Sequence, residues 1–276
     1  MPWSERARRE HVRKYLRYAS DLSDKEWEAL RRLIPKPFRR GRPRLADMRS
    51  VLNAVLYILV TGCQWRMLPR EFPPRSTVQR YFYTWRDRGL WKRIARLLVR
   101  RERRRIGRKS MPSVGVIDSQ SIKTAEGGDA RGFDAAKRVT GRKRHIIVDT
   151  QGNLLEVQVH AASIQDNHGA VPLLNALGGW SSHLRHIFAD RVYRGPKLLN
   201  AVAETGPWTI EVVTRTQSVG TFKVEPKRWV VERTFAWLTR NRRLARDYER
   251  KTTTAEAWIW IAAIKTNLRR IARNAQ

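Results

Sequence analysis

The chain has 276 residues, of which 41% are hydrophobic, so it is long enough to bury a sizeable core and is not compositionally disordered. Its 57 Lys and Arg residues outnumber its 25 Asp and Glu residues, which gives a formal net charge of +32. This charge argues against an enzyme of small neutral substrates and favours a polyanionic partner, nucleic acid first. Residues 1–110 hold 31 of the cations against 10 acids, so the positive charge is densest there. Composition alone leaves open a ribosomal or chromatin-like binding protein without catalysis.

Cys63 is the only cysteine, which excludes an internal disulfide and a zinc cluster of thiolates, and predicts a reducing, cytoplasmic location. The first ten residues have no apolar core, so we expect no signal peptide. The longest apolar run, at 51–60, is too short to cross a bilayer. Together these features predict a soluble protein that does not bind membranes.

The N-terminal region has the pattern of helices separated by short connections. Ser23 and Glu26 form a capping box for a helix at 24–34, which ends before Pro35. After a basic connector that contains proline and glycine, residues 46–61 predict a mostly apolar helix.

A third helix, with a basic surface, is predicted at 77–88, where Ser76 and Gln79 fit a second capping box. Short turns and a basic last helix resemble a helix-turn-helix module, although aromatic residues at these spacings are also typical of a plain helical bundle. Residues 92–109 continue as a basic amphipathic helix or tail. We therefore predict a small all-helical, basic DNA-binding domain at 1–110, followed by a catalytic domain at 111–276.

From residue 111 onward the pattern changes from helices to strands. Strands are predicted at 114–118, 143–149, 154–160, 183–190 and 208–214, and helices at 166–177, 197–203, 227–241 and 254–273. The strand at 154–160 alternates apolar and polar residues, so we expect it to be half exposed. A meander of three strands followed by alternating helices and strands predicts an α/β fold with a mixed sheet covered by helices. This order matches the ribonuclease-H-like fold.

Three acidic residues fall on elements that this topology brings together. Asp118 ends the first strand and Asp190 ends the fourth, and we expect these strands to lie side by side. Two close carboxylates in a core are unfavourable unless a cation lies between them, and hard divalent ions such as Mg²⁺ take oxygen ligands. Glu232 lies on one helical stripe with Trp229 and Ala236, and a metal ion held by the two Asp residues would give this acid a partner.

Each acid also has an interpretation without catalysis. An Asp at a strand end often caps a loop, and Glu232 could pair with Arg228 or Arg233. For a single acid this interpretation carries as much weight as the catalytic one. Three acids on the matching elements of one topology are much less expected by chance, so we interpret Asp118, Asp190 and Glu232 as a metal site.

The motifs around these acids resemble those of bacterial insertion-sequence transposases of the DDE type, in the insertion-sequence five family. The similarity covers nearly the whole chain and includes L-S-D-K-E-W-E-A-L, G-C-Q-W-R-M-L-P, V-I-D-S-Q-S-I-K-T, G-R-K-R-H-I-I-V-D-T-Q-G, F-A-D-R-V-Y-R-G and R-W-V-V-E-R-T-F-A-W-L. The resemblance assigns the family's catalytic and metal-binding acids to Asp118, Asp190 and Glu232. One departure is that Arg191 and Val192 stand where such proteins usually carry small residues.

The resemblance implies that the protein binds the ends of an insertion sequence, cleaves phosphodiester bonds and joins the 3′-hydroxyl ends to target DNA. Two Mg²⁺ (or Mn²⁺) ions would be held by the three acids. The implied partners are double-stranded DNA, both element ends and target, and further copies of the chain in a homodimer or higher oligomer, in the bacterial cytoplasm with the nucleoid. The alternatives are a metal-dependent nuclease of the same fold without strand transfer, and a catalytically inactive DNA-binding derivative.

Basic residues in both predicted domains are candidates for DNA contact. The predicted contacts are Arg80, Arg86, Arg88, Lys123, Lys143, Arg144, Arg191, Arg228, Arg233 and Arg240. The predicted loop at 119–141 is a further candidate, because it also contains Arg131, Lys137 and Arg138.

Overall fold

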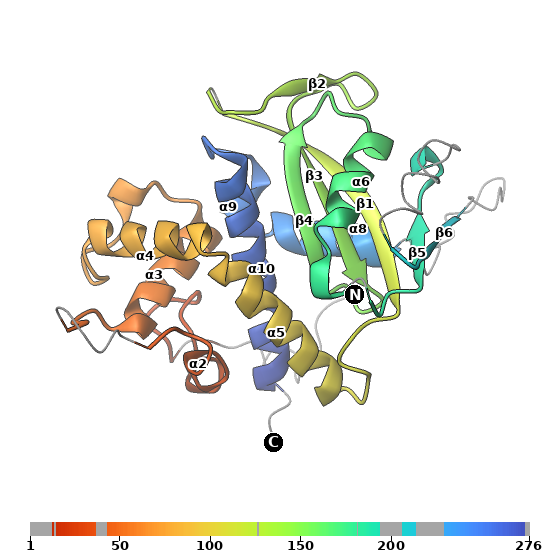
Figure 1. The fold of residues 1–276 in the computed structure, drawn as a ribbon. Helices are drawn as coiled ribbons and strands as arrows, with labels where there is room; N and C mark the ends of the chain where they lie inside the picture. Colours follow the sequence, from red (N-terminus) through yellow and green to blue (C-terminus); the bar gives the residue numbers. More distant parts are fainter. Residues whose placement is uncertain are drawn as a thin grey trace.

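The fold was obtained as a computed structural model that describes residues 13, 15–36, 43–125, 127–180, 182–193, 206–213 and 229–273. An all-helical first part is followed by a sheet with helices packed on it (Figure 1). The α-helices are α2 (Asp24–Arg31), α3 (Met48–Thr61), α4 (Arg75–Asp87), α5 (Leu90–Arg105), α6 (Asp166–Asn175), α8 (Trp229–Thr239), α9 (Arg242–Ala245) and α10 (Thr252–Arg273). The strands are β1 (Val114–Lys123), β2 (Gly132–Asp134), β3 (Val139–Asp149), β4 (Leu154–Ala161), β5 (His186–Ala189) and β6 (Thr209–Val212). The helix predicted at 197–203 lies outside the described residues.

The first helices begin and end largely as their local sequence predicts. The capping box of α2 is confirmed, because the Ser23 hydroxyl accepts from the Glu26 amide while the Glu26 carboxylate accepts from the Ser23 amide. The second predicted capping box is wrong. Helix α4 already begins at Arg75 after Pro74, so Ser76 lies within the first turn and makes no side-chain cap.

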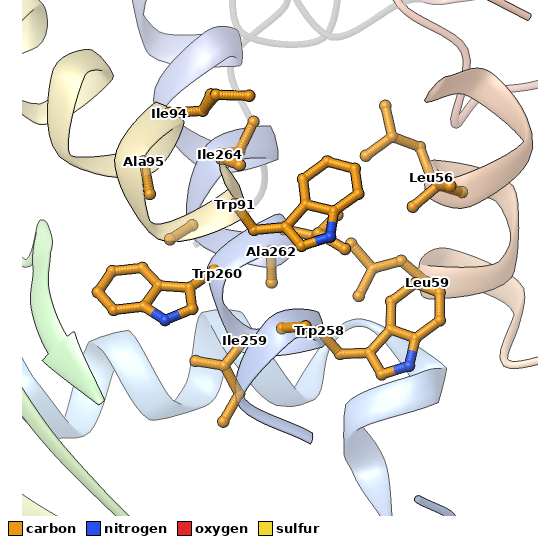
Figure 2. Close-up of a cluster of buried hydrophobic side chains, with 14 of the residues drawn as sticks. Leu56, Leu59, Trp91, Ile94, Ala95, Trp258, Ile259, Trp260, Ala262 and Ile264 are labelled. Atoms are coloured by element: carbon orange, nitrogen blue, oxygen red, sulfur yellow. The ribbon is translucent and has the colours of Figure 1, made fainter. Parts of the chain in front are cut away.

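The C-terminal helix α10 lies between the helical part and the sheet (Figure 1). It packs against α5, α2, α3 and α4 on one side and against β4 on the other. Figure 2 shows its buried Trp258, Trp260 and Ile264 close to side chains of α3 and α5. The largest hydrophobic core therefore combines residues from both sides of the boundary predicted near 110. In the described part of the chain, no helix combines the length and apolarity needed to cross a bilayer.

The sheet is mixed, as the order of elements predicts. Its strand order is β2-β3-β1-β5-β6, with β4 also paired to β3. Strand β3 is antiparallel to β1, β2 and β4, whereas β5 is parallel to both β1 and β6. Helices α8 and α10 cover one face of the sheet and α6 packs against the other. This arrangement is a mixed α/β fold in which the first and fourth predicted strands are neighbours.

Two predictions about the strands need correction. Strand β1 does not end at Asp118 but continues to Lys123, because residues 119–123 keep pairing with β3 as far as Gly141. The predicted loop at 119–141 is thus strand at both of its ends, in β1 and β3, and it includes β2. Strand β4 is not half exposed, since the apolar side chains on its two faces belong to two different cores and its Glu156 is buried in ion pairs with α5.

Candidate active site between β1 and β5

Asp118 and Asp190 occupy matched levels on neighbouring parallel strands. Val116 of β1 pairs with Phe188 of β5, and each acid follows two residues later in its own segment. Asp118 remains within β1, while Asp190 directly follows the last residue of β5. Both side chains are half buried. The predicted juxtaposition of these two acids therefore follows from the strand register.

The backbone next to each acid helps to orient its carboxylate. The Ser119 amide donates to Asp118 Oδ1 at 2.7 Å, and the Arg191 amide donates to Asp190 Oδ1 at 2.5 Å. Residues Arg191–Tyr193 form a 3₁₀ turn, in which the Tyr193 amide donates to the Asp190 carbonyl at 2.9 Å. A short rigid turn thus connects the second acid to a fully buried tyrosine.

The pKa of the Tyr193 hydroxyl reflects the negative charge of the acids near it. Burial raises the pKa of Tyr193 well above its usual value, and the nearby carboxylates of Asp118, Asp166 and Asp190 raise this pKa further. The three acids therefore act on one side chain, which places them in the same part of the molecule.

A chain of hydrogen bonds fixes Tyr193 against the sheet. His160 Nδ1 faces the Ala161 carbonyl at 3.0 Å, so this nitrogen carries the proton and Nε2 is left as an acceptor. His145 Nδ1 then donates to His160 Nε2 at 3.1 Å, and the Tyr193 hydroxyl donates to His145 Nε2 at 2.5 Å. Burial and the neighbouring His160 lower the pKa of His145 to about 3, which keeps the ring neutral as this chain requires.

A second polar cluster lies next to the first acid. The Ser119 hydroxyl donates to Asp166 Oδ1 at 2.8 Å, and Lys143 Nζ lies 2.7 Å from the same oxygen. Burial alone would raise the pKa of Asp166, but hydrogen bonds from Lys143 and Ser119 lower it overall. Sequence reasoning missed the roles of His145, Ser119 and Tyr193. The sequence alone gives no signal for these roles, because Ser119 and His145 become partners only through the register of β1 and β3.

Glu232 lies on α8, which packs against β1 and β3 on the face opposite α6. The helix buries Val231 and Phe235, whereas Trp229, Glu232 and Ala236 are exposed. The predicted stripe around Glu232 is therefore the outward side of the helix and not a buried one. Among the described residues, no three His, Cys, Asp or Glu side chains are grouped closely enough to hold one metal ion. The structure brings two of the predicted ligands together and does not gather all three as a set.

Several of the predicted DNA contacts are exposed to solvent. Arg80 and Arg88 line a groove of about 1100 Å³ on the helical part, together with the cations Lys36, Arg44 and Arg93. The remaining exposed candidates are Lys123, Arg191 and Arg240. Arg228 lies outside the described residues.

Two further candidates are engaged within the protein. Arg86 donates to the Thr254 hydroxyl at 2.7 Å and pairs with Asp87. The Arg233 guanidinium lies 4.4 Å and 4.6 Å from the ring centres of Trp229 and Trp237. This stacking fixes Arg233 along α8, so its charge is only partly available to DNA.

The predicted DNA contacts of Lys143 and Arg144 are corrected by their burial. Lys143 is 4% exposed and forms an ion pair with Asp166. Arg144 is 1% exposed and donates to the Leu244 carbonyl at 2.7 Å. Burial lowers the pKa of Arg144 to about 10. Both side chains point into the packed faces of β3, so neither presents its charge to a DNA backbone.

Comparison with known protein families accounts for nearly all of the chain. Residues 109–268 match the family described as "Transposase DDE domain". Residues 22–111 match the family described as "Putative transposase of IS4/5 family". The two matched segments overlap at 109–111, just before β1.

Two of the individual relatives come from an insertion element. The chain is 31% identical over 129 residues to the "Putative transposase for insertion sequence element IS402" of Burkholderia cepacia, a match that covers 43% of this chain and 59% of that protein. It is 32% identical over 117 residues to the "Insertion element IS402 uncharacterized 16.2 kDa protein" of the same species, covering 40% of this chain and 78% of that protein. An uncharacterized protein of Sinorhizobium fredii, y4sN, is 29% identical over 79 residues, which are 29% of this chain and 63% of that protein. No solved structure matches the chain.

Proposed function

Because the chain belongs to the DDE transposases of bacterial insertion sequences, we propose that it binds the ends of such an element, cleaves them and joins their 3′-hydroxyl groups to target DNA. The observation that carries this proposal is the matched position of Asp118 and Asp190 on the parallel strands β1 and β5. The net charge of +32 supports a DNA substrate, since each cation near a phosphate releases a condensed counterion.

The family is one whose members depend on divalent metal ions, and the donor set of this chain fits such ions. Asp118 and Asp190 supply hard oxygen ligands, and we propose that Glu232 becomes the third ligand from α8. We propose Mg²⁺, or Mn²⁺ in its place, with two ions per site. Bound metal would supply charge stabilisation for the attacking and leaving oxygens of phosphoryl transfer.

The chain's own residues prepare this site before substrate binds. The Ser119 and Arg191 amides each donate to one carboxylate oxygen of the preceding Asp and so help to orient the two acids. Tyr193, held by His145, keeps the turn after β5 in place, and so keeps Asp190 level with Asp118. The buried cluster on the α6 face excludes water from beneath the two acids.

A ribonuclease-H-like catalytic core at 111–276 is the fold that best accounts for the sheet. Its support is the sequence β4-β3-β1-β5-β6 across the sheet, with antiparallel β3 and the two acids on adjacent strands. We propose that residues 1–110 form the helical DNA-binding part, which reads the element ends through the groove beside α4. We also propose that the protein acts on DNA as a homodimer or higher oligomer. Its proposed location is the bacterial cytoplasm, with the nucleoid.

Cleavage of DNA that carries the sequences flanking the gene tests the proposal. The full chain should cut at the element ends only with Mg²⁺ or Mn²⁺ and should then join the 3′ ends to a second DNA. Asp118→Asn, Asp190→Asn and Glu232→Gln should each lower cleavage at least a hundredfold and keep end binding. Cutting without joining would replace the proposal by a nuclease, and end binding without any cutting would replace it by an inactive derivative.

A further inference from the structure

The hairpin formed by β2, its turn and the start of β3 presents an aromatic ring among cations. Phe133 is 54% exposed, one of the more exposed large apolar side chains of the described residues. Arg131, Lys137 and Arg138 are exposed around it. We call these four side chains the hairpin surface. Single exposed apolar residues are common, so the argument depends on how this one is held and what lies beside it.

The inner side of the hairpin is anchored through Asp134, which is 7% exposed. Its carboxylate accepts from the Ser121 hydroxyl at 2.5 Å and from the Lys137 amide at 3.1 Å, and it lies 3.5 Å from Lys143 Nζ. A charged group that makes three such contacts in a buried place fixes the turn to β1 and β3. Phe133, the neighbour of Asp134, therefore projects from a rigid support.

The base of the hairpin is anchored on the other face by Arg142, which is fully buried. Its guanidinium donates to the Ala130 carbonyl at 2.8 Å and to Asp129 Oδ1 at 2.9 Å. It also donates to the carbonyls of Glu249 and Arg250, at 2.7 Å and 2.9 Å. Arg142 thus joins the hairpin to the connection between α9 and α10.

That connection extends the hairpin surface with similar side chains. Tyr248 is 51% exposed, and Arg246, Arg250 and Lys251 are exposed beside it. The Asp129 amide donates to the Arg250 carbonyl at 2.9 Å, which keeps the two segments together. The two joined segments together carry six exposed cations and two exposed aromatic rings.

The register of the strands places Phe133 on the same face of the sheet as Asp118. Asp118 pairs with Ile146, and Phe133 pairs with Thr140, which is six residues before Ile146 on the same strand. Side chains an even number of residues apart leave a strand on the same side, and cross-strand partners share a face. Gly132 is level with Gly141 and Lys123, so the hairpin lies about 17 Å beyond Asp118 along β1. A DNA duplex whose scissile phosphate lies at Asp118 is long enough to contact the hairpin as well.

On the premise of the proposed function, we propose that the hairpin surface is a second DNA contact at which Phe133 inserts against a base step of the duplex. The cations around it bind phosphates on either side, which offsets the repulsion between the backbone and the acids of the site. The phenyl ring would exchange its contact with water for stacking against a base. Any base has a face on which an aromatic ring can stack. The contact would bend or open the duplex a few base pairs from the cleavage position.

Duplexes that carry 2-aminopurine at successive positions next to the cleavage site test this contact. Binding of the full chain in Ca²⁺, which allows binding to be followed without cleavage, should raise the fluorescence at one step because the base there loses its stacking. Phe133→Ala should abolish that rise and weaken binding roughly tenfold, whereas Phe133→Tyr should preserve both. Arg138→Ala should instead lower the slope of log affinity against log salt by about 0.9 and keep the fluorescence rise.

Leu97→Ala provides the matched control, since Leu97 is also an exposed apolar residue, 39% exposed, on helix α5. It should leave both the fluorescence and the affinity unchanged, and thermal unfolding should show that every variant is folded. The inference is overturned if Phe133→Ala behaves like Leu97→Ala. In that case wild-type binding and Mg²⁺-dependent cleavage would still support the proposed function. A wild-type chain that binds no DNA at low salt would remove both proposals together.

Discussion

Arg103 of α5 and Asp149 of β3 form a buried ion pair, with Nη1 and Oδ2 2.5 Å apart and side chains 7% and 0% exposed. The pair joins the helical part of the chain to the sheet. Asp149 also accepts from the amides of Gln151 and Asn153, both at 2.9 Å, and so closes the β3–β4 turn.

Asp149→Asn should therefore destabilise the whole protein. The substitution leaves the Arg103 guanidinium buried without its counter-charge, which typically costs about 3–5 kcal/mol. Urea unfolding followed by circular dichroism measures the change. Glu28→Gln is the control, because the Arg31–Glu28 pair has a similar distance of 2.6 Å but side chains 49% and 56% exposed, and should cost less than about 1 kcal/mol. Equal effects of the two substitutions would contradict the argument.

Gly169→Ala should disrupt the histidine pair beneath the active site. A Cβ at this position would lie 2.4 Å from His145 Nδ1 and 2.6 Å from His160 Nε2, so both rings would have to move. We expect a lower melting temperature and weaker cleavage. Gly179→Ala is the matched control, since the nearest atom to its Cβ would be 4.0 Å away. The prediction fails if both alanine variants melt together with the wild type.

Stability should fall on the acid side because of His145. Burial and His160 lower its folded pKa to about 3, while the unfolded chain titrates near the ordinary value of about 6.5. Above that value both states are neutral and the stabilisation is complete; between about 6.5 and 3 only the unfolded state takes up the proton, so stability is lost as pH falls. Asp166, Lys143 and Lys137 also act on the ring, and Asp166 opposes the shift.

Melting temperatures of wild type and His145→Gln between pH 7.5 and 4.5 test this dependence. The variant should be less stable at neutral pH and lose less stability on acidification, because one titrating group is gone. His168→Gln changes an exposed histidine and should reproduce the wild-type profile. If the melting temperatures of wild type and His145→Gln fall in parallel as pH is lowered, another group causes the loss of stability in acid.

Arg191→Gly should weaken DNA binding and leave the Mg²⁺ requirement of cleavage unchanged. Arg191 is exposed, and a guanidinium turned toward solvent can reach a phosphate without repelling metal ions at the acids. The slope of log affinity against log salt should fall by about 0.9, and Arg191→Lys should restore it. A large gain of cleavage at low Mg²⁺ would mean instead that Arg191 obstructs the site.

The order of elements and the two strand acids were predictable because hydrophobic periodicity records which faces are buried. The end of β1 was not, since S-Q-S-I-K after Asp118 has the polarity of a loop. Those residues remain in a strand because β3 pairs with them and the α6 face supplies partners such as Asp166 for Ser119. Local sequence does not contain such partners, which come from positions far along the chain.

Dependence on partners far along the chain also explains why the burial of two basic residues was not predicted. Lys143 and Arg144 have the composition of a DNA-binding segment, yet tertiary contacts with Asp166 and the Leu244 carbonyl bury them. The orientation of α8 was also beyond the sequence, because Trp229 and Ala236 are as apolar as the residues that the helix buries. Which apolar stripe is covered depends on the neighbouring strands and on α10.

The place of α10 has a genetic consequence. A frameshift or stop codon before Thr252 deletes the helix that fills the space between α3, α5 and the sheet, and with it Trp258 and Trp260. The apolar sides of α3 and α5 would then be left facing water, and the remaining product is expected to be degraded or to aggregate. A gene interrupted before Thr252 is therefore expected to leave no stable shortened protein.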